Sequence, residues 1–232
     1  MQMPSATARV SVLIPALDEQ DAIGCVIDEI PRPPVRDILV VDNGSTDNTA
    51  QVAMAHGARV VPEPRRGYGS ACLTGLAHTR EADIIVFLDG DHSDYPEEIP
   101  ALIAPILAGE ADLVIGSRAL GQRERRALTP QQVYGNALAC LLMRVLVGHR
   151  FTDLGPFRAI TREALDRLGM RDTNYGWTVE MQMKAVRKGL RIREVPAGYR
   201  CRIGKSKISG TLSGALKAGY KIITTILRYA RS

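Results

Sequence analysis

Two aspartates, Asp89 and Asp91, flank a glycine directly after the apolar run Ile84 to Leu88. Because Gly90 has no side chain, the backbone can bend there and bring both carboxylates to one hard cation such as Mg²⁺ or Mn²⁺. An Asp-Gly turn after a strand is common, and by itself it needs no metal. The surrounding sequence has to decide between a metal site and a turn.

A second polar segment, Val41 to Thr49, also follows an apolar run. Gly44 allows a tight turn there, and Ser45 or Thr46 can cap the next helix. Asp42 is not needed for that cap, so its carboxylate can accept hydrogen bonds from a nucleotide base. Ligands of open parallel sheets bind at the carboxyl ends of the strands. We therefore expect the segments that follow Asp42 and Leu88 to share one site.

Short apolar runs alternate with segments of helical period along most of the chain, which predicts an α/β fold with a central, mostly parallel sheet flanked by helices. Strands are expected at residues 10–15, 37–42, 58–61, 84–88, 113–116, 157–161 and 190–195. Helices are expected from about residue 18 and at residues 46–56, 68–80, 96–108, 136–147, 178–187 and 211–232.

The 232 residues suit a single domain, 1–232. We divide it into a nucleotide-binding half at 9–118, an acceptor-side half at 119–210 and a basic amphipathic helix at 211–232. The tail helix can lie on an anionic bilayer, such as the inner face of the cell membrane, or pack on its own domain. The oligomeric state is left open, and a homo-oligomer is compatible with the sequence.

Composition narrows the partners and the compartment. The net charge of +5 makes nucleotide diphosphates, lipid phosphates, acidic membranes or nucleic acid plausible partners. With three phenylalanines, one tryptophan and no recognised motif, nucleic acid is disfavoured. The four cysteines show no paired spacing, which favours a reduced protein. Neither a signal peptide nor a transmembrane run is evident, so a cytoplasmic protein is expected.

Eight segments in order resemble family 2 glycosyltransferases with the GT-A fold, and within them the dolichol-phosphate mannosyltransferase-like polyprenyl-phosphate glycosyltransferases. The resemblance covers almost the whole chain. The segments are IPALDE at 14–19, VDNGSTD at 41–47, RGYG at 66–69, LDGD at 88–91 with Pro96, GSR at 116–118, TDLGPFR at 152–158, WTVE at 177–180 and RIGKSK at 202–207.

The resemblance implies a metal-dependent, inverting transfer of a hexose from a nucleoside diphosphate sugar, UDP-glucose or GDP-mannose, to a polyprenyl phosphate. Asp89 and Asp91 would approach the Mg²⁺ or Mn²⁺ and the diphosphate. The other donor-side residues would be Pro15, Ala16, Glu19 and Asp42 around the base and ribose, Gly67 and Gly90 beside the donor, and Arg202 and Lys205 against phosphate oxygens.

Two positions depart from the family pattern. Asn43 stands where a second aspartate is common, and Ser93 and Asp94 follow His92 where relatives often have a glutamine ligand. The third protein ligand to the metal is therefore left open.

On the acceptor side, the resemblance points to Arg118, Arg126, Asp153 and Arg158, whose guanidinium groups could clamp a phosphate. Glu180 is expected to be catalytic, either as a general base or in orienting the acceptor. An alcohol acceptor needs a base, whereas an ionised lipid phosphate attacks unaided. A surface glutamate in a first helical turn is the simpler alternative.

Two other functions remain open. The same donor chemistry could serve a hydroxyl acceptor on a glycolipid, a polysaccharide or a small metabolite. Alternatively, the chain could be a catalytically idle nucleotide-binding module that recruits a membrane partner.

Overall fold

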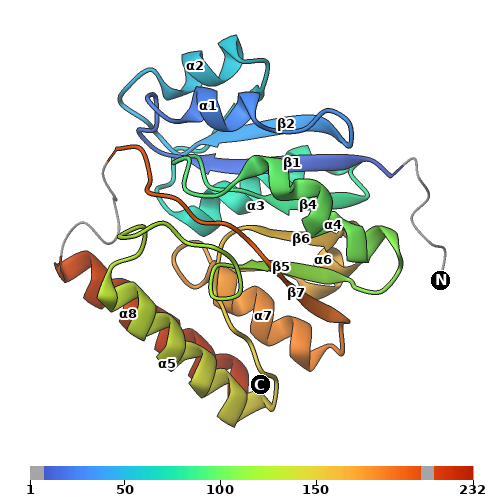
Figure 1. The fold of residues 1–232 in the computed structure, drawn as a ribbon, viewed down its shortest axis with the longest axis vertical. Coiled ribbons are helices and arrows are strands. Elements are labelled where there is room, and N and C mark those ends of the chain that lie inside the picture. The colour runs from blue at the N-terminus through green and yellow to red at the C-terminus, as the bar shows by residue number, and fades with distance from the viewer. Residues whose placement is uncertain (1–7, 205–211, 232) are drawn as a thin grey trace.

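The computed structural model describes residues 8–204 and 212–231, which form three layers around one seven-stranded sheet (Figure 1). The strand order is β3-β2-β1-β4-β6-β5-β7. All neighbours pair in parallel except β6, which runs antiparallel to β4 and β5. The strands are β1 (Val10–Ala16), β2 (Val35–Asp42), β3 (Arg59–Pro62), β4 (Ile84–Phe87), β5 (Leu113–Ser117), β6 (Arg158–Thr161) and β7 (Ile192–Pro196). The predicted mostly parallel sheet is confirmed.

Three helices cover one face of the sheet: α1 (Ile23–Asp28), α2 (Thr49–Ala55) and α4 (Ile99–Leu107). Their inward side chains, among them Ile23 and Leu102, pack with Val12 and Val86 of the central strands in one apolar core. A 3₁₀ turn, η1 (Pro96–Glu98), precedes α4. The helix predicted from residue 96 therefore starts as a tighter turn.

The opposite face carries α3 (Tyr68–His78), α6 (Arg162–Leu168) and α7 (Trp177–Arg187), and α5 (Pro130–Val147) and α8 (Leu212–Arg231) pack against α7. Trp177 lies edge-on to Phe87 of β4 in this second core. Ile226 of α8 is completely buried there. Figure 1 shows α5 and α8 side by side at the end of the molecule away from α1 and α2.

Helix α2 begins at Thr49, three residues later than predicted, because the residues before it bond to another loop. The amide of Thr46 donates to Asp18 Oδ1 at 2.7 Å, and Ser45 Oγ accepts from the amide of Asp18 at 2.9 Å. Asp47 Oδ1 accepts from the amide of Thr49 at 3.0 Å. The polar residues expected to cap a helix instead join the loops that follow β1 and β2.

Two helical segments were not predicted. Helix α6 was not expected at all, and α5 begins six residues early, at Pro130. Thr129 starts α5 with a capping box, because its side chain accepts from the amide of Gln132 while the Gln132 side chain accepts from the amide of Thr129.

Among residues 8–204 and 212–231, no helix is both long and apolar enough to cross a membrane. All four cysteines lie within those ranges and are free thiols, Cys72 and Cys140 buried and Cys25 and Cys201 exposed.

Candidate active site

A cavity of about 270 Å³ opens where β1, β2 and β4 end. These strands are adjacent and parallel, so their following loops meet at one edge of the sheet. The cavity is lined by Pro15, Ala16, Leu17, Glu19, Asn43, Arg66, Gly67, Tyr68, Ala71, Asp89, Gly90, Asp91, Asn174, Tyr175 and Arg202. Eight of the ten predicted donor-side residues are among them. Asp42 is not, and Lys205 lies outside the described residues.

Asp89 and Asp91 form the acidic side of this cavity. Oδ1 of Asp89 is buried and accepts no hydrogen bond from the described residues. Burial and the charge of Asp91 together raise the pKa of Asp89 to about 7, against the opposing charge of Arg202. Asp91 Oδ2 lies 3.0 Å from Arg202 Nη1, and its Oδ1 accepts from the amide of Ser93 at 2.9 Å.

This donor set fits a hard divalent cation. The unpartnered oxygen of Asp89 lies in a pocket with a second carboxylate, and oxygen ligands of this kind suit Mg²⁺ or Mn²⁺. Within the described part of the chain, no group of three or more His, Cys, Asp or Glu side chains is arranged to hold a metal. His92 does not line the cavity, and its Nε2 lies 2.9 Å from Glu29 Oε1.

Asn43, rather than Asp42, lines the cavity. Asp42 Oδ1 accepts from the amide of Ser45 at 2.9 Å, so one oxygen of the carboxylate predicted to bind the base takes part in the turn after β2. The Asn43 amide donates to the carbonyls of Glu63 and Arg65 at 2.9 and 2.8 Å, and Oδ1 accepts from the amide of Gly67 at 2.7 Å. Asn43 thereby fixes the loop that carries Gly67.

The loop around Thr173 forms the wall of the cavity opposite β1. Asn174 and Tyr175 line the cavity, and the carbonyl of Thr173 accepts from the amide of Ser70 at 3.0 Å. A Cβ on Gly69 would lie 2.0 Å from the carbonyl oxygen of Asp172. The glycines expected to make room for the donor also make room for this neighbouring backbone.

Glu180 lies behind that wall and does not line the cavity. Its side chain is completely buried, and it accepts from the amides of Arg171 and Asp172, the closest at 2.7 Å. Tyr229 Oη of α8 donates to Oε1 at 2.7 Å, and Lys184 Nζ lies 2.6 Å from the same oxygen. The position of Glu180 therefore indicates support of the 171–175 loop instead of proton transfer in the cavity.

Arg118 and Asp153, both predicted to bind the acceptor, form a bidentate ion pair. Nε and Nη2 of Arg118 each lie 2.7 Å from an oxygen of Asp153, and the guanidinium stacks over Tyr199 with its carbon 5.0 Å from the ring centre.

Asp94, which the sequence marked only as a departure from the family pattern, is 2% exposed, and its carboxylate has no hydrogen-bond partner among the described residues. Burial, and the charges of Asp89 and Asp91, raise the pKa of Asp94.

The other two arginines predicted to bind the acceptor differ in exposure. Arg158 is 1% exposed and donates to the carbonyls of Gly155 and Thr178, so it supports the loop before β6 and has almost no surface for an acceptor. This corrects the expectation that Arg158 clamps a phosphate directly. Arg126 is exposed in the loop before α5 and has a φ of 75°.

Residues 11–169 match the family described as glycosyl transferase family 2. The chain belongs to this family. The glycosyltransferase assignment made from the sequence motifs is thereby confirmed.

This family 2 glycosyltransferase has similar relatives in bacteria. It is 39% identical over 213 residues to an uncharacterized glycosyltransferase of Mycobacterium tuberculosis, across 90% of this chain and 94% of the relative. It is 31% identical over 224 residues to the undecaprenyl-phosphate mannosyltransferase of Micrococcus luteus, across 89% of this chain and 90% of the relative.

The fold is similar to that of glucosyl-3-phosphoglycerate synthase from Mycobacterium tuberculosis, solved with Mn²⁺, UDP-glucose and phosphoglyceric acid. The TM-score is 0.79 at 29% identity, covering 98% of this chain and 82% of the synthase. The GT-A fold implied by the motifs is confirmed.

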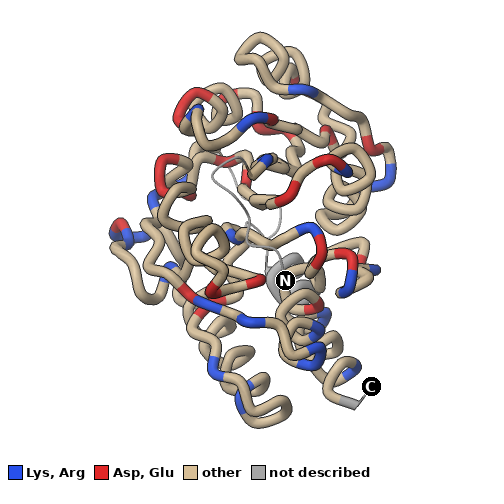
Figure 2. The backbone as a smooth tube through the Cα atoms, turned by 90° about the vertical axis from the view of Figure 1, so that its right-hand side faces the viewer, with Lys and Arg blue, Asp and Glu red and all other residues tan. Residues whose placement is uncertain are grey.

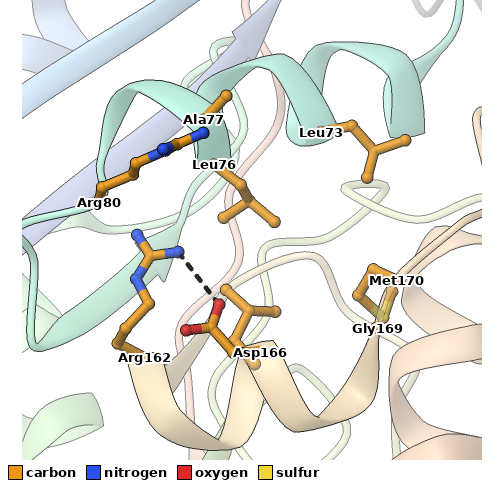
Figure 3. A pocket seen from close by; sticks show the side chains of 9 residues that line it. Leu73, Leu76, Ala77, Arg80, Arg162, Asp166, Gly169 and Met170 are labelled. Atoms are coloured by element: carbon orange, nitrogen blue, oxygen red, sulfur yellow. Dashed lines mark ion pairs between the residues drawn. The ribbon is translucent and has the colours of Figure 1, made fainter.

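A second hollow of about 480 Å³ lies between α3 and α6 of the glycosyltransferase (Figure 3). Arg162 and Asp166, one turn apart on α6, form an ion pair at 3.7 Å on one side of it, and Leu73 and Leu76 of α3 line the other side. None of the predicted site residues lines this hollow. The cavity at the strand ends is therefore the candidate active site.

Proposed function

We propose that this glycosyltransferase moves a hexose from a nucleoside diphosphate sugar to a polyprenyl phosphate, with inversion at the anomeric carbon. UDP-glucose and GDP-mannose are the two candidate donors. The observation that carries the acceptor assignment is the complete burial of Glu180, whose carboxylate is held by two backbone amides, Tyr229 and Lys184.

The donor would occupy the 270 Å³ cavity with its diphosphate toward Asp89, Asp91 and Arg202. Asp89 and Asp91 would hold Mg²⁺ or Mn²⁺, which when bound stabilises the negative charge that develops on the departing nucleotide. Arg202 adds a fixed positive charge on the same side, since its guanidinium contacts Asp91 at 3.0 Å and Glu19 at 3.0 Å. Lys205 is proposed for the same role from the sequence motif alone.

A lipid phosphate suits this site because it does not require a general base. A phosphate monoester is ionised near neutral pH, so one of its oxygens can attack the anomeric carbon while the bond to the nucleotide diphosphate breaks. Arg118 and Arg126 would lie near the incoming phosphate, with Asp153 holding the Arg118 guanidinium in place at 2.7 Å. The similarity to an undecaprenyl-phosphate mannosyltransferase supports this choice.

A small hydroxyl acceptor is the second candidate, favoured by the likeness to a synthase solved with UDP-glucose and phosphoglyceric acid. A hydroxyl needs a proton acceptor as it attacks. The carboxylate that the sequence motif suggests for this role, Glu180, is completely buried and does not line the cavity, which is why the lipid phosphate is the first candidate.

The experiment is a transfer assay with labelled UDP-glucose and GDP-mannose and with Mn²⁺, offering undecaprenyl phosphate or phosphoglyceric acid as acceptor. We expect label in the lipid extract, with the anomeric configuration opposite to that of the donor by NMR. Label only in the phosphoglyceric acid product would establish the second candidate. Tight nucleotide binding with no transfer to either acceptor would favour an idle nucleotide-binding module.

A further inference from the structure

Helices α5 and α8, which pack side by side, each expose a row of large apolar side chains. On α5, Tyr134, Leu138, Leu141 and Val145 are 75%, 49%, 54% and 73% exposed and recur every three or four residues, so they share one side of the helix. Tyr220, Ile223 and Leu227 of α8, at 74%, 36% and 42%, repeat the pattern. We call these seven residues the apolar face.

The apolar face is accompanied by positive charge and by no negative charge from its own helices. Neither the 18 residues of α5 nor the 20 residues of α8 include an aspartate or glutamate. Arg144 and Arg228 are exposed beside the apolar residues, and Arg150 is exposed just after α5. Figure 2 marks the lysine and arginine positions of both helices in blue.

We infer that the apolar face docks this glycosyltransferase onto an anionic lipid bilayer. An amphipathic helix with arginines and lysines beside an apolar side binds at the boundary between headgroups and acyl chains. Anionic headgroups complement the arginines, each basic residue near such a surface adding attraction. Exposed apolar patches of this kind on a soluble surface mark interaction sites.

A second copy of the chain fits the face less well. In a twofold-symmetric dimer each patch meets its own copy, so Arg144 and Arg228 would approach the positive charges of the partner patch. No acidic residue of α5 or α8 is available to offset that repulsion. Charge complementarity therefore favours the bilayer.

Both helices of the face bond to loops near the candidate active site. On α5, the Asn136 amide donates to the carbonyl of Thr152 at 3.0 Å and accepts from the amide of Leu154 at 2.9 Å, on either side of the Asp153 that holds Arg118. On α8, Lys221 Nζ lies 2.7 Å from Asp172 Oδ2, beside the loop that walls the cavity. Docking would place the acceptor-side loops next to the lipid surface, which deepens, and in that respect rests on, the proposed lipid phosphate acceptor.

The test is co-sedimentation of the full chain with vesicles of pure phosphatidylcholine and of an equimolar mixture with phosphatidylglycerol. The wild-type protein should bind the mixed vesicles more tightly, and salt should weaken that binding. Leu141→Glu should lower the partition constant about tenfold, since it replaces an apolar side chain that docking would bury in the bilayer with a charge that anionic headgroups repel. Circular dichroism would check the fold of each variant.

Met54→Glu is the matched control, because Met54 on α2 is 55% exposed, almost the same as Leu141, and lies at the other end of the molecule. It should leave vesicle binding unchanged. Equal loss with Met54→Glu, or no preference of the wild type for anionic vesicles, would overturn the inference. So would a wild-type dimer that Leu141→Glu dissociates while vesicle binding persists.

A second readout separates this inference from the proposed acceptor. Transfer to a short, water-soluble polyprenyl phosphate is measured without vesicles. Transfer without vesicle binding would refute docking and leave the acceptor standing. Vesicle binding without transfer to any polyprenyl phosphate would support docking and contradict the acceptor.

Discussion

At the scale of single residues, burial separates the side chains that can touch a substrate from those that hold the site together. Asp89, Asp91 and Arg202 line the cavity, whereas Glu180 and Arg158 are 0% and 1% exposed and bind backbone groups. All five were candidates from the sequence because charged residues in family motifs suggest chemistry. Only the packing around each one distinguishes contact with a ligand from support of a loop.

The role of Glu180 predicts a specific pattern for Glu180→Gln. Lys184, whose side chain is 12% exposed, would lose its carboxylate partner, and breaking a buried ion pair costs about 3 kcal/mol. We therefore expect a lower Tm and a raised KM for the nucleotide sugar, with kcat for a polyprenyl phosphate reduced less than about tenfold. Steady-state kinetics and a thermal melt measure these quantities.

Tyr229→Phe is the milder companion, because it removes only the hydrogen bond from α8 to Glu180 and should cost about 1 kcal/mol. A general base would behave differently. If Glu180→Gln reduced kcat by about 10² or more with Tm and KM unchanged, Glu180 would be the base after all.

At the scale of elements, the cavity depends on a few close contacts between loops. Asn43 holds the loop before α3 through three hydrogen bonds, and Gly67 and Gly69 let the backbone of Asp172 and Thr173 come close. The 171–175 loop is in turn held by Glu180 of α7 and Lys221 of α8. Elements distant in sequence thus determine the shape of the cavity.

Gly69→Ala should disturb this packing, because its Cβ would lie 2.0 Å from the carbonyl oxygen of Asp172. Overpacking of this kind costs about 1–3 kcal/mol. We expect a lower Tm and weaker nucleotide binding, measured by thermal melts and calorimetry. Gly135→Ala on α5 is the control, since its Cβ would meet no atom within 4 Å apart from its chain neighbours and the backbone of its own helix, and replacing an exposed helical glycine should stabilise the fold slightly. Equal effects of the two variants would contradict the role given to Gly69.

Glu63 links the pH dependence of stability to the same loop. Hydrogen bonds from Arg65 and Thr74 lower the pKa of Glu63 to about 2, from an ordinary value of 4.5. Because the folded-state pKa is the lower one, the stabilisation is present above about pH 4.5 and is lost as the pH falls toward 2.

Glu63→Gln should therefore lower Tm at neutral pH by about 2–4 °C, the effect of roughly 1 kcal/mol in a chain of this size. The difference from the wild type should shrink as the pH is lowered from about 4.5 toward 2, which a series of melts would follow. A difference that stayed constant over this range would show that the Glu63 carboxylate does not contribute.

At the scale of the whole molecule, the sequence predicts features that depend on neighbouring residues and misses features that depend on contacts between segments far apart in the chain. Apolar runs located all seven strands, and six of the eight predicted cavity residues lie at or just after the ends of β1 and β4, which the parallel sheet brings together. The other two, Gly67 and Arg202, came from the family motifs. The antiparallel direction of β6 has no local signal. Nor does the burial of Glu180, which requires Tyr229 of α8 to pack beside it across 49 residues of sequence.

Asn43 and Asn174 show the same limit within the site. Asn43 occupies a position where the family motif suggested aspartate. It follows β2, and Glu63 and Arg65 follow the neighbouring parallel strand β3, so contacts between these residues could have been predicted from the order of the strands. Asn174 lies on a loop between α6 and α7 that no motif marked. It reaches the cavity only because α7 fixes that loop.

Calorimetric titration of UDP and GDP, each with and without Mn²⁺, tests most directly whether the cavity at Asp89 and Asp91 is the donor site. We predict that one nucleotide binds in a one-to-one ratio, that Mn²⁺ tightens its binding about tenfold or more, and that Asp91→Asn removes the gain. The account would be contradicted if neither nucleotide bound, or if Mn²⁺ strengthened binding equally in Asp91→Asn.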